Sequence, residues 1–230
     1  MDADTGAQPS FATTQKVWDA PTRLFHWLVV GLIAFSWWTA EEHIFDWHKA
    51  SGLAIVGLLV FRIYWGVAGP ETARFAHFIK GPRTILSYVG SLFGPEHKLA
   101  FGHNPLGGLS VAAMIVALVA QVTLGLFAPD TDTGLDSGPL SRFVSYDFAE
   151  MAGDLHEDAF NILLFLIGIH IAAIAFYLIV KRANLIGPMI TGRRKSGATG
   201  PARGLASVAL WRFVLGVLIA GAVVWPLATM

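Results

Sequence analysis

The chain has 230 residues, of which 54% are hydrophobic and only 14% are Asp, Glu, Lys or Arg, and its formal net charge is zero. This balance is far from that of soluble domains and indicates an integral membrane protein with several spans and short connections. The neutral charge argues against nucleic-acid binding, and the absence of cysteine excludes disulfides, Cys-ligated iron–sulfur clusters and thioether-bound haem.

Hydropathy predicts an all-α integral membrane protein. Residues 1–16 form a polar arm with no signal-peptide core, and residues 17–195 form the main transmembrane domain. Residues 196–230 are interpreted as a basic linker and an additional span that contains Arg212. Stretches of roughly 20 apolar residues can cross about 30 Å of hydrocarbon as helices. They mark four clear spans and a fifth: Leu24–Ala40, Ala50–Ala68, Leu106–Ala128, Ala159–Val180 and Leu205–Leu227.

Charge separates the connections into two chemical types. Residues 41–49 and 129–158 together hold 11 acidic residues and only two basic ones, Lys49 and Arg142. The arm and residues 69–103 and 181–203 carry most of the Lys and Arg. By the positive-inside rule we expect the basic side, with the N-terminus, to face the cytoplasm.

Four histidines lie in or beside the predicted spans. His26 follows the cytoplasmic start of the first span, and His48 lies near the outer start of the second. His156 lies near the outer start of the fourth span, and His170 follows 14 residues later, about halfway along it. Fourteen residues are almost four helical turns, so both side chains leave one face of the helix, ~21 Å apart along its axis.

Depth matching predicts two histidine pairs. His48 matches His156, and His26 is the intramembrane histidine left to meet His170, although their nominal depths differ by ~12 Å, a mismatch that helix tilt can absorb. Two imidazoles from different helices are the axial ligands of a low-spin b-type haem. A single histidine in a span is often only a hydrogen-bonded core residue, but four depth-matched ones are hard to explain in that way. A tetrahedral zinc site does not suit two distant pairs.

Five segments resemble the bacterial cytochrome b561 family, which includes the b-type cytochrome subunits of nickel–iron hydrogenases. They are VWDAPTRLFHWLVV, DWHKASGLAIVGLLVFRIYWGVAG, GHNPLGGLSVAAMIVALVAQVTLGLF, LHEDAFNILLFLIGIH and NLIGPMITGRRK, and they cover about Val17 to Lys195. The resemblance implies a four-helix bundle with two haems b, ligated by His26 with His170 and by His48 with His156. The fifth hydrophobic segment departs from that four-helix pattern.

Other polar residues are secondary candidates. Arg62, near the cytoplasmic end of the second span, can pair with a haem propionate or snorkel to the surface. His103 can hydrogen-bond or protonate a quinone beside the inner haem, where similar proteins bind one, and Asn104 is either part of that site or a helix cap before Pro105. His43, His77 and His97 are interpreted as solvated or interfacial. The span glycines are interpreted as positions of close helix or porphyrin approach: Gly52, Gly57, Gly107, Gly108 and Gly168.

These features favour a dihaem b-type cytochrome that carries electrons between the quinone pool and a periplasmic redox partner. The acidic outer connection can dock a basic c-type cytochrome or a hydrogenase electron-transfer subunit. The first alternative is a self-contained quinone-linked oxidoreductase, such as a superoxide oxidase. The second is a transporter or structural anchor without haem. Besides the lipid, a second copy of the chain is a further candidate partner.

Overall fold

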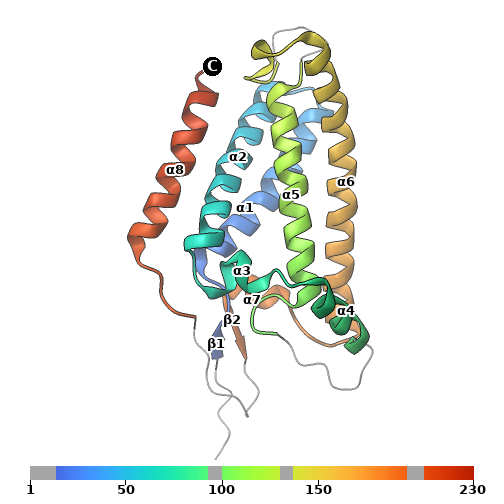
Figure 1. Ribbon diagram of the computed structural model, residues 1–230, viewed down its shortest axis with the longest axis vertical. Coiled ribbons are helices and arrows are strands. Elements are labelled where there is room, and N and C mark those ends of the chain that lie inside the picture. The colour runs from blue at the N-terminus through green and yellow to red at the C-terminus, as the bar shows by residue number, and fades with distance from the viewer. Residues whose placement is uncertain (1–13, 93–99, 130–136, 196–204) are drawn as a thin grey trace, which may run out of the picture.

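The computed structural model describes residues 14–92, 100–129, 137–195 and 205–230. Five of its helices are long and apolar enough to cross a membrane, which agrees with the five predicted spans. They stand roughly side by side (Figure 1). Their bounds are α1 Ala20–Glu41, α2 Phe45–Ala68, α5 Pro105–Phe127, α6 Tyr146–Ile179 and α8 Leu210–Ala228.

Short elements gather at the two ends of the bundle. One end, here called the sheet end, carries a two-stranded antiparallel sheet in which Gln15 pairs with Arg194. The opposite end, here called the loop end, carries the connection between α5 and α6 (Figure 1). The short elements are β1 Thr14–Lys16, η1 Glu71–Ala73, α3 Phe75–Phe78, α4 Pro82–Ser91, η2 Ser141–Phe143, α7 Ile186–Thr191 and β2 Arg193–Lys195.

The sheet ties the end of the N-terminal arm to the segment that follows α7. The backbone N–H of Val17 donates to the carbonyl of Gly192 at 2.8 Å. Gly192 ends α7 with φ of 78°, and a side chain there would meet the carbonyl of Trp18 at 2.7 Å. Glycine is therefore required for this close approach of the two segments.

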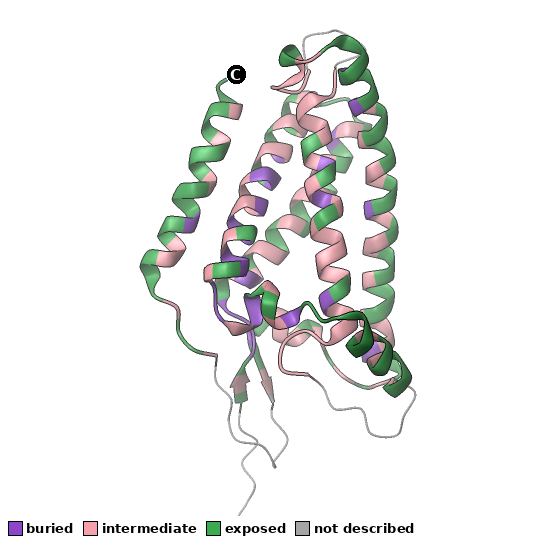
Figure 2. Ribbon diagram, in the orientation of Figure 1, coloured by how far each residue is buried: buried purple, intermediate pink, exposed green. Residues whose placement is uncertain are grey.

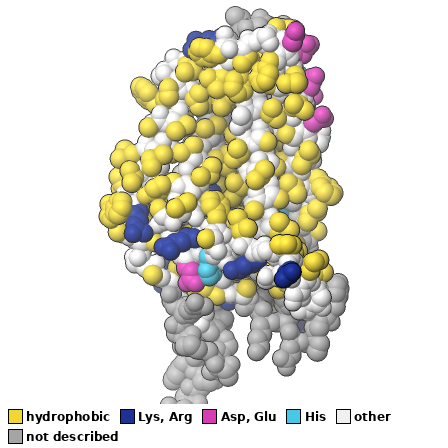
Figure 3. Space-filling model, in the orientation of Figure 1, with side chains coloured by type: hydrophobic (Ala, Val, Ile, Leu, Met, Phe, Trp, Pro, Cys, Tyr) yellow, Lys and Arg dark blue, Asp and Glu magenta, His cyan; other side chains and the backbone are white. Residues whose placement is uncertain are grey.

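The long helices pack as two antiparallel hairpins and one added helix. The helix α1 packs on α2, α5 packs on α6, and the two hairpins meet chiefly where α2 contacts α5. Leu59, Leu118 and Leu163, from α2, α5 and α6, belong to the buried cluster at their centre. The added helix α8 packs only along α2 among the close helix pairs. Most of the outward surface is exposed and hydrophobic (Figures 2 and 3), as expected for helices that face lipid.

Several helices begin at other residues than the predicted apolar spans, and two of these differences bear on the site. The helix α6 begins at Tyr146, not at Ala159, because its first half is amphipathic and acidic and therefore has no hydropathy signal. Much of the predicted outer connection is thus helical, and His156 lies well inside the helix. The helix α8 begins at Leu210, not at Leu205. Arg212 consequently lies in its first turn, where a cation can remain at the membrane interface.

Candidate functional site

The rings of His48 and His156 meet near the loop end of the bundle. His48 lies in the first turn of α2, and His156 lies in the first half of α6. Their ring centroids are 6.1 Å apart, and the ring planes are nearly perpendicular at 85°. The structure therefore brings the predicted outer pair together from two helices that are far apart in sequence.

Backbone carbonyls fix the orientation of both rings. The Nδ1 of His48 donates to the carbonyl of Ser36 at 2.9 Å, and the Nδ1 of His156 donates to the carbonyl of Gln121 at 2.9 Å. A carbonyl oxygen can only accept, so each Nδ1 carries the proton and each Nε2 keeps its lone pair. This is the arrangement in which a histidine binds a metal through Nε2 while a second group holds its other nitrogen.

The spacing of this pair fits one iron between two imidazoles. Metal–imidazole bonds of about 2 Å bring the centres of two facing rings to roughly 6 Å, close to the observed 6.1 Å. The Nε2 of His156 lies 3.2 Å from the side-chain amide nitrogen of Gln121. Among the described residues no cluster of three or more His, Asp or Glu side chains suits a metal ion. A pair of histidines suits an iron whose remaining ligands come from a macrocycle.

A glycine on α5 makes room for the His156 ring. A side chain at Gly125 would meet Cε1 of His156 at 2.7 Å. No real Cβ contact is so short, so His156 can keep its position only beside glycine. A Cβ added at Gly52 or Gly168 would meet no neighbouring atom within 4 Å, whereas one at Gly57 would touch Val224 of α8 at 3.2 Å.

His26 and His170 form the second predicted pair, toward the sheet end. They lie on α1 and α6, and their imidazoles are close enough to interact electrostatically. The helix α1 runs obliquely to the other helices (Figure 1). The Nδ1 of His26 is buried without a hydrogen-bond partner. Among the described residues, this ring therefore lacks the carbonyl contact that orients His48 and His156.

Arg62 is a buried cation near the sheet-end terminus of α2, and it interacts electrostatically with His103. Its side chain is only 2% exposed, so it does not snorkel to the surface. The guanidinium lies 4.8 Å from the ring centroid of Phe75, and its Nη1 is buried without a hydrogen-bond partner. Asp19 supplies the opposite charge, and the indole of Trp65 donates to Asp19 at 2.8 Å. The remaining donor of Arg62 fits an anionic ligand group such as a propionate.

His103 lies between two aromatic rings just before α5. Its ring centroid is 4.6 Å from that of Trp18 and 4.7 Å from that of Phe78. Burial, and secondly the positive charge of Arg62, lower the pKa of His103 to about 3. Its Nδ1 is buried and has no hydrogen-bond partner among the described residues. His103 is therefore a neutral imidazole that can accept or donate one hydrogen bond, and it interacts electrostatically with both His26 and His170.

Asn104 has protein partners for both ends of its side-chain amide. Its Oδ1 accepts from the backbone of Gly107 at 2.7 Å and caps α5, as one of the two sequence interpretations predicts. Its Nδ2 donates to the hydroxyl of Tyr177 at 3.0 Å, which in turn meets the hydroxyl of Tyr88 at 2.5 Å. This network connects α4, α5 and α6 at the sheet end.

The other described histidines outside the site, His43 and His77, belong to neither pair. His43 is exposed at the loop end, and His77 contacts the carboxylate of Glu71 at 3.3 Å. His97 lies outside the described residues. The interpretation of His43 and His77 as interfacial side chains agrees with these positions.

Sequence reasoning missed Ser36, Gln121 and Asp19. Ser36 and Gln121 act through backbone carbonyls, which have no sequence signal. The buried side chain of Gln121 was nevertheless visible as a polar residue within an apolar span, which is a functional indicator in membrane proteins. Asp19 is an acidic residue at an end of the protein where most charged residues are basic, which is also a detectable signal.

Comparison with known proteins agrees with the geometry. The family model of prokaryotic cytochrome b561 matches residues 17–192, most of the chain. No curated protein and no solved structure matches the chain. The match ends before α8, which is therefore an addition to the matched region. With the five membrane-length helices and the histidine pairs, it establishes that this multi-pass membrane protein belongs to the prokaryotic cytochrome b561 family of haem b electron-transfer proteins.

Proposed function

We propose that the protein is a dihaem cytochrome b that carries electrons across a bacterial inner membrane between the quinone pool and a redox partner outside. The observation that carries this proposal is the His48–His156 pair, with rings 6.1 Å apart and both Nδ1 atoms bonded to carbonyls. Haem b, when bound, supplies a one-electron iron couple, and the protein supplies its ligands and surroundings.

The two histidine pairs provide one ligand site near each membrane surface. His48 and His156 would hold the outer haem, and His26 and His170 the inner one. The two ligands on α6 are 14 residues apart, or ~21 Å along the helix axis. Leu59, Leu118 and Leu163 fill part of the interior with apolar side chains and keep water out. Arg62 would balance a propionate of the inner haem.

A quinone site at the sheet end is supported by His103. It is neutral, and its buried Nδ1 has no hydrogen-bond partner. It also interacts electrostatically with both histidines of the inner pair. A neutral imidazole there can hydrogen-bond a quinone oxygen without adding a charge to the apolar interior. Because both ends of the Asn104 amide have protein partners, His103 is the stronger candidate for direct contact.

The loop end offers an acidic docking surface for a basic partner. Its exposed carboxylates come from the end of α1, the start of α2 and the first half of α6. Asp and Glu side chains are visible along one edge of this end in Figure 3. Such a surface attracts a basic c-type cytochrome or the basic face of a hydrogenase subunit. The described acidic residues are Glu41, Glu42, Asp46, Asp147, Glu150, Asp154, Glu157 and Asp158.

Proteoliposomes test the proposed electron path. A lipid-soluble quinol should reduce the haems, and a basic cytochrome c added on the acidic side should reoxidise them. The oxidation rate should fall as ionic strength rises, because salt screens the attraction. Haems that a quinol cannot reduce would contradict the quinone link. Rapid quinone reduction by superoxide with the purified protein alone would instead favour the self-contained oxidoreductase.

A further inference from the structure

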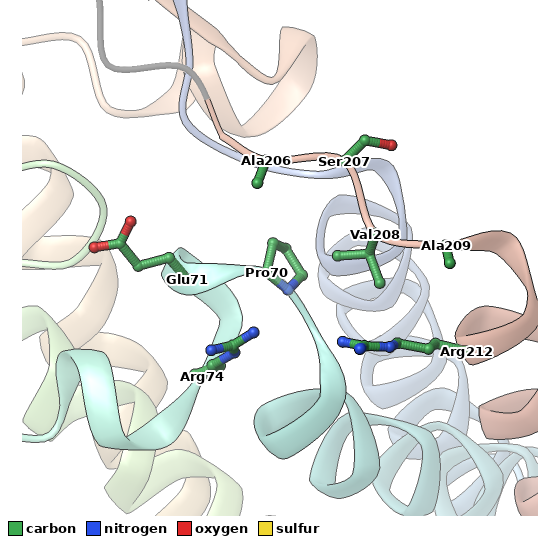
Figure 4. Close-up of a pocket in the computed structure, with 8 residues that line it drawn as sticks. All are labelled: Pro70, Glu71, Arg74, Ala206, Ser207, Val208, Ala209 and Arg212. Carbon is green, nitrogen blue, oxygen red and sulfur yellow. The ribbon is translucent and has the colours of Figure 1, made fainter.

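A pocket of about 530 Å³ lies at the sheet end between η1 and the segment that leads into α8 (Figure 4). One wall is formed by the turn after α2, and the other by the start of α8. Its lining residues include Pro70, Glu71, Arg74, Val208 and Arg212. Because the pocket depends on α8, it lies partly outside the region that matches the family. It also contains none of the residues proposed for haem or quinone binding.

Two guanidinium groups point into this pocket. In Figure 4 the side chains of Arg74 and Arg212 approach it from opposite sides, beneath Pro70. Each is anchored to a backbone carbonyl at the end of α2: Arg74 donates to Gly69 at 2.8 Å, and Arg212 donates to Ala68 at 3.3 Å. These bonds use one donor of each guanidinium and leave its other N–H groups for a ligand.

Among the described residues, no ion pair joins a carboxylate to Arg74 or Arg212. Glu71 lines the same pocket, but its carboxylate contacts His77 at 3.3 Å and points away from both guanidiniums in Figure 4. Two cations that face one cavity repel each other, and an anion between them removes that cost. The guanidinium fork matches the oxygens of a phosphate in particular.

The pocket opens where two membrane helices end. Exposed apolar side chains occur close to these helix ends: Val67, near the end of α2, is 73% exposed, and Trp211, whose ring centroid is 5.5 Å from the Arg212 guanidinium, is 61% exposed. Lys and Arg side chains form a row along this end of the hydrophobic surface in Figure 3. A molecule in the pocket would thus have its polar part between the arginines and its apolar part along lipid-facing helix surfaces.

We propose that this pocket binds the headgroup of an anionic phospholipid, with the phosphate between Arg74 and Arg212 and the acyl chains along Val67 and Trp211. The basic side of such proteins faces the leaflet in which anionic lipids interact with Lys and Arg. The bound lipid fastens α8 to α2 at the point where α8 enters the membrane. This role is independent of the proposed electron transfer.

Native mass spectrometry of the haem-loaded protein in mild detergent tests this proposal. Wild-type protein should retain one phosphatidylglycerol, and it should retain phosphatidylcholine about tenfold less well because only the anionic lipid has a net charge. The double variant Arg74→Gln/Arg212→Gln should lower phosphatidylglycerol retention to the phosphatidylcholine level. The control Lys80→Gln/Arg83→Gln removes the same charge from exposed residues at this end and should retain the lipid.

Three results would overturn the proposal. The first is equal retention of phosphatidylglycerol and phosphatidylcholine by wild-type protein. The second is an equal loss of phosphatidylglycerol from both double variants. The third is displacement of the lipid by millimolar inorganic phosphate, which would indicate a free-phosphate site. The haem spectrum shows whether each variant is folded. If Arg74→Gln/Arg212→Gln does not fold, Arg74→Lys/Arg212→Lys keeps both charges and should bind the lipid, and the wild-type comparison remains decisive.

Discussion

Arg62 is a charged residue buried in the bundle at the end where the inner haem is proposed. The positive charge of Arg62 should repel the oxidised inner haem more than the reduced one, because the oxidised haem carries one more positive charge. Arg62 should therefore favour the reduced haem. Arg62→Gln should therefore lower the inner haem potential by on the order of 60 mV, or roughly 1.4 kcal/mol. Redox titration of the haem absorbance measures this shift. Arg83→Gln, an exposed change at the same end, should leave both potentials unchanged.

His103 predicts a pH dependence of stability. Its pKa in the folded protein is lowered to about 3 from the ordinary 6.5, so the unfolded chain takes up a proton first as pH falls. Above pH 6.5 His103 is neutral in both the folded and the unfolded protein and does not affect the free energy of unfolding. Between pH 6.5 and about 3 only the unfolded chain is protonated at this residue, so the free energy of unfolding decreases as pH falls. His103→Gln should therefore reduce the drop in melting temperature between pH 7.5 and pH 5, followed through the haem absorbance. An unchanged drop, equal to that of the exposed control His43→Asn, would contradict this assignment.

At the level of single residues, the sequence predicted positions better than interactions. The spacing and depths of His48 and His156 were sufficient to predict that their rings meet. Their orientation depends on the carbonyls of Ser36 and Gln121, and any residue type can supply a carbonyl. The burial of Arg62 could not be predicted either, because it results from rings of α3 that fold over the end of α2.

The contact between α5 and α6 should be needed for the outer haem site. Gly125→Ala places a methyl group against the His156 ring and should reduce binding of one haem, detected as a lower haem-to-protein ratio. Gly221→Ala is a matched control, because a side chain there meets no atom within 4 Å and the helix gains the same propensity. Equal haem loss in both variants would contradict the proposed contact.

The packing of α8 on α2 can be tested by cross-linking in a chain that has no natural cysteine. A side chain at Gly57 lies 3.2 Å from a methyl group of Val224. Gly57→Cys/Val224→Cys should therefore form a disulfide under mild oxidation, visible as a mobility shift on gels. Gly57→Cys/Val223→Cys, with the second cysteine on the exposed side of α8, should not. Cross-linking of both pairs to the same extent would contradict this packing.

The elements that could be predicted from the sequence are the helices that consist of long apolar segments. Five spans were found in this way, but the start of α6 was missed because its acidic first half has no such run. The strands β1 and β2 are polar and have three residues each. They pair with each other although they lie near opposite ends of the sequence. Such pairing is a tertiary property, and short polar segments contain little information about it.

For the whole molecule, the two ends have different chemistry. The loop end combines the His48–His156 pair with exposed carboxylates, and the sheet end combines the His26–His170 pair with Arg62 and His103. This polarity supports electron transfer between a membrane-soluble carrier at one end and a protein at the other. The added α8 lies beside this path and not within it (Figure 1).

The central claim is that four histidines ligate two haems, and reduced-minus-oxidised spectra with a haem-to-protein ratio test it most directly. Wild-type protein should contain two b-type haems per chain. His48→Ala and His170→Ala should each retain one, and the double variant should retain none. A colourless wild-type protein after expression with sufficient haem, or two haems retained in either single variant, would contradict the ligand assignment.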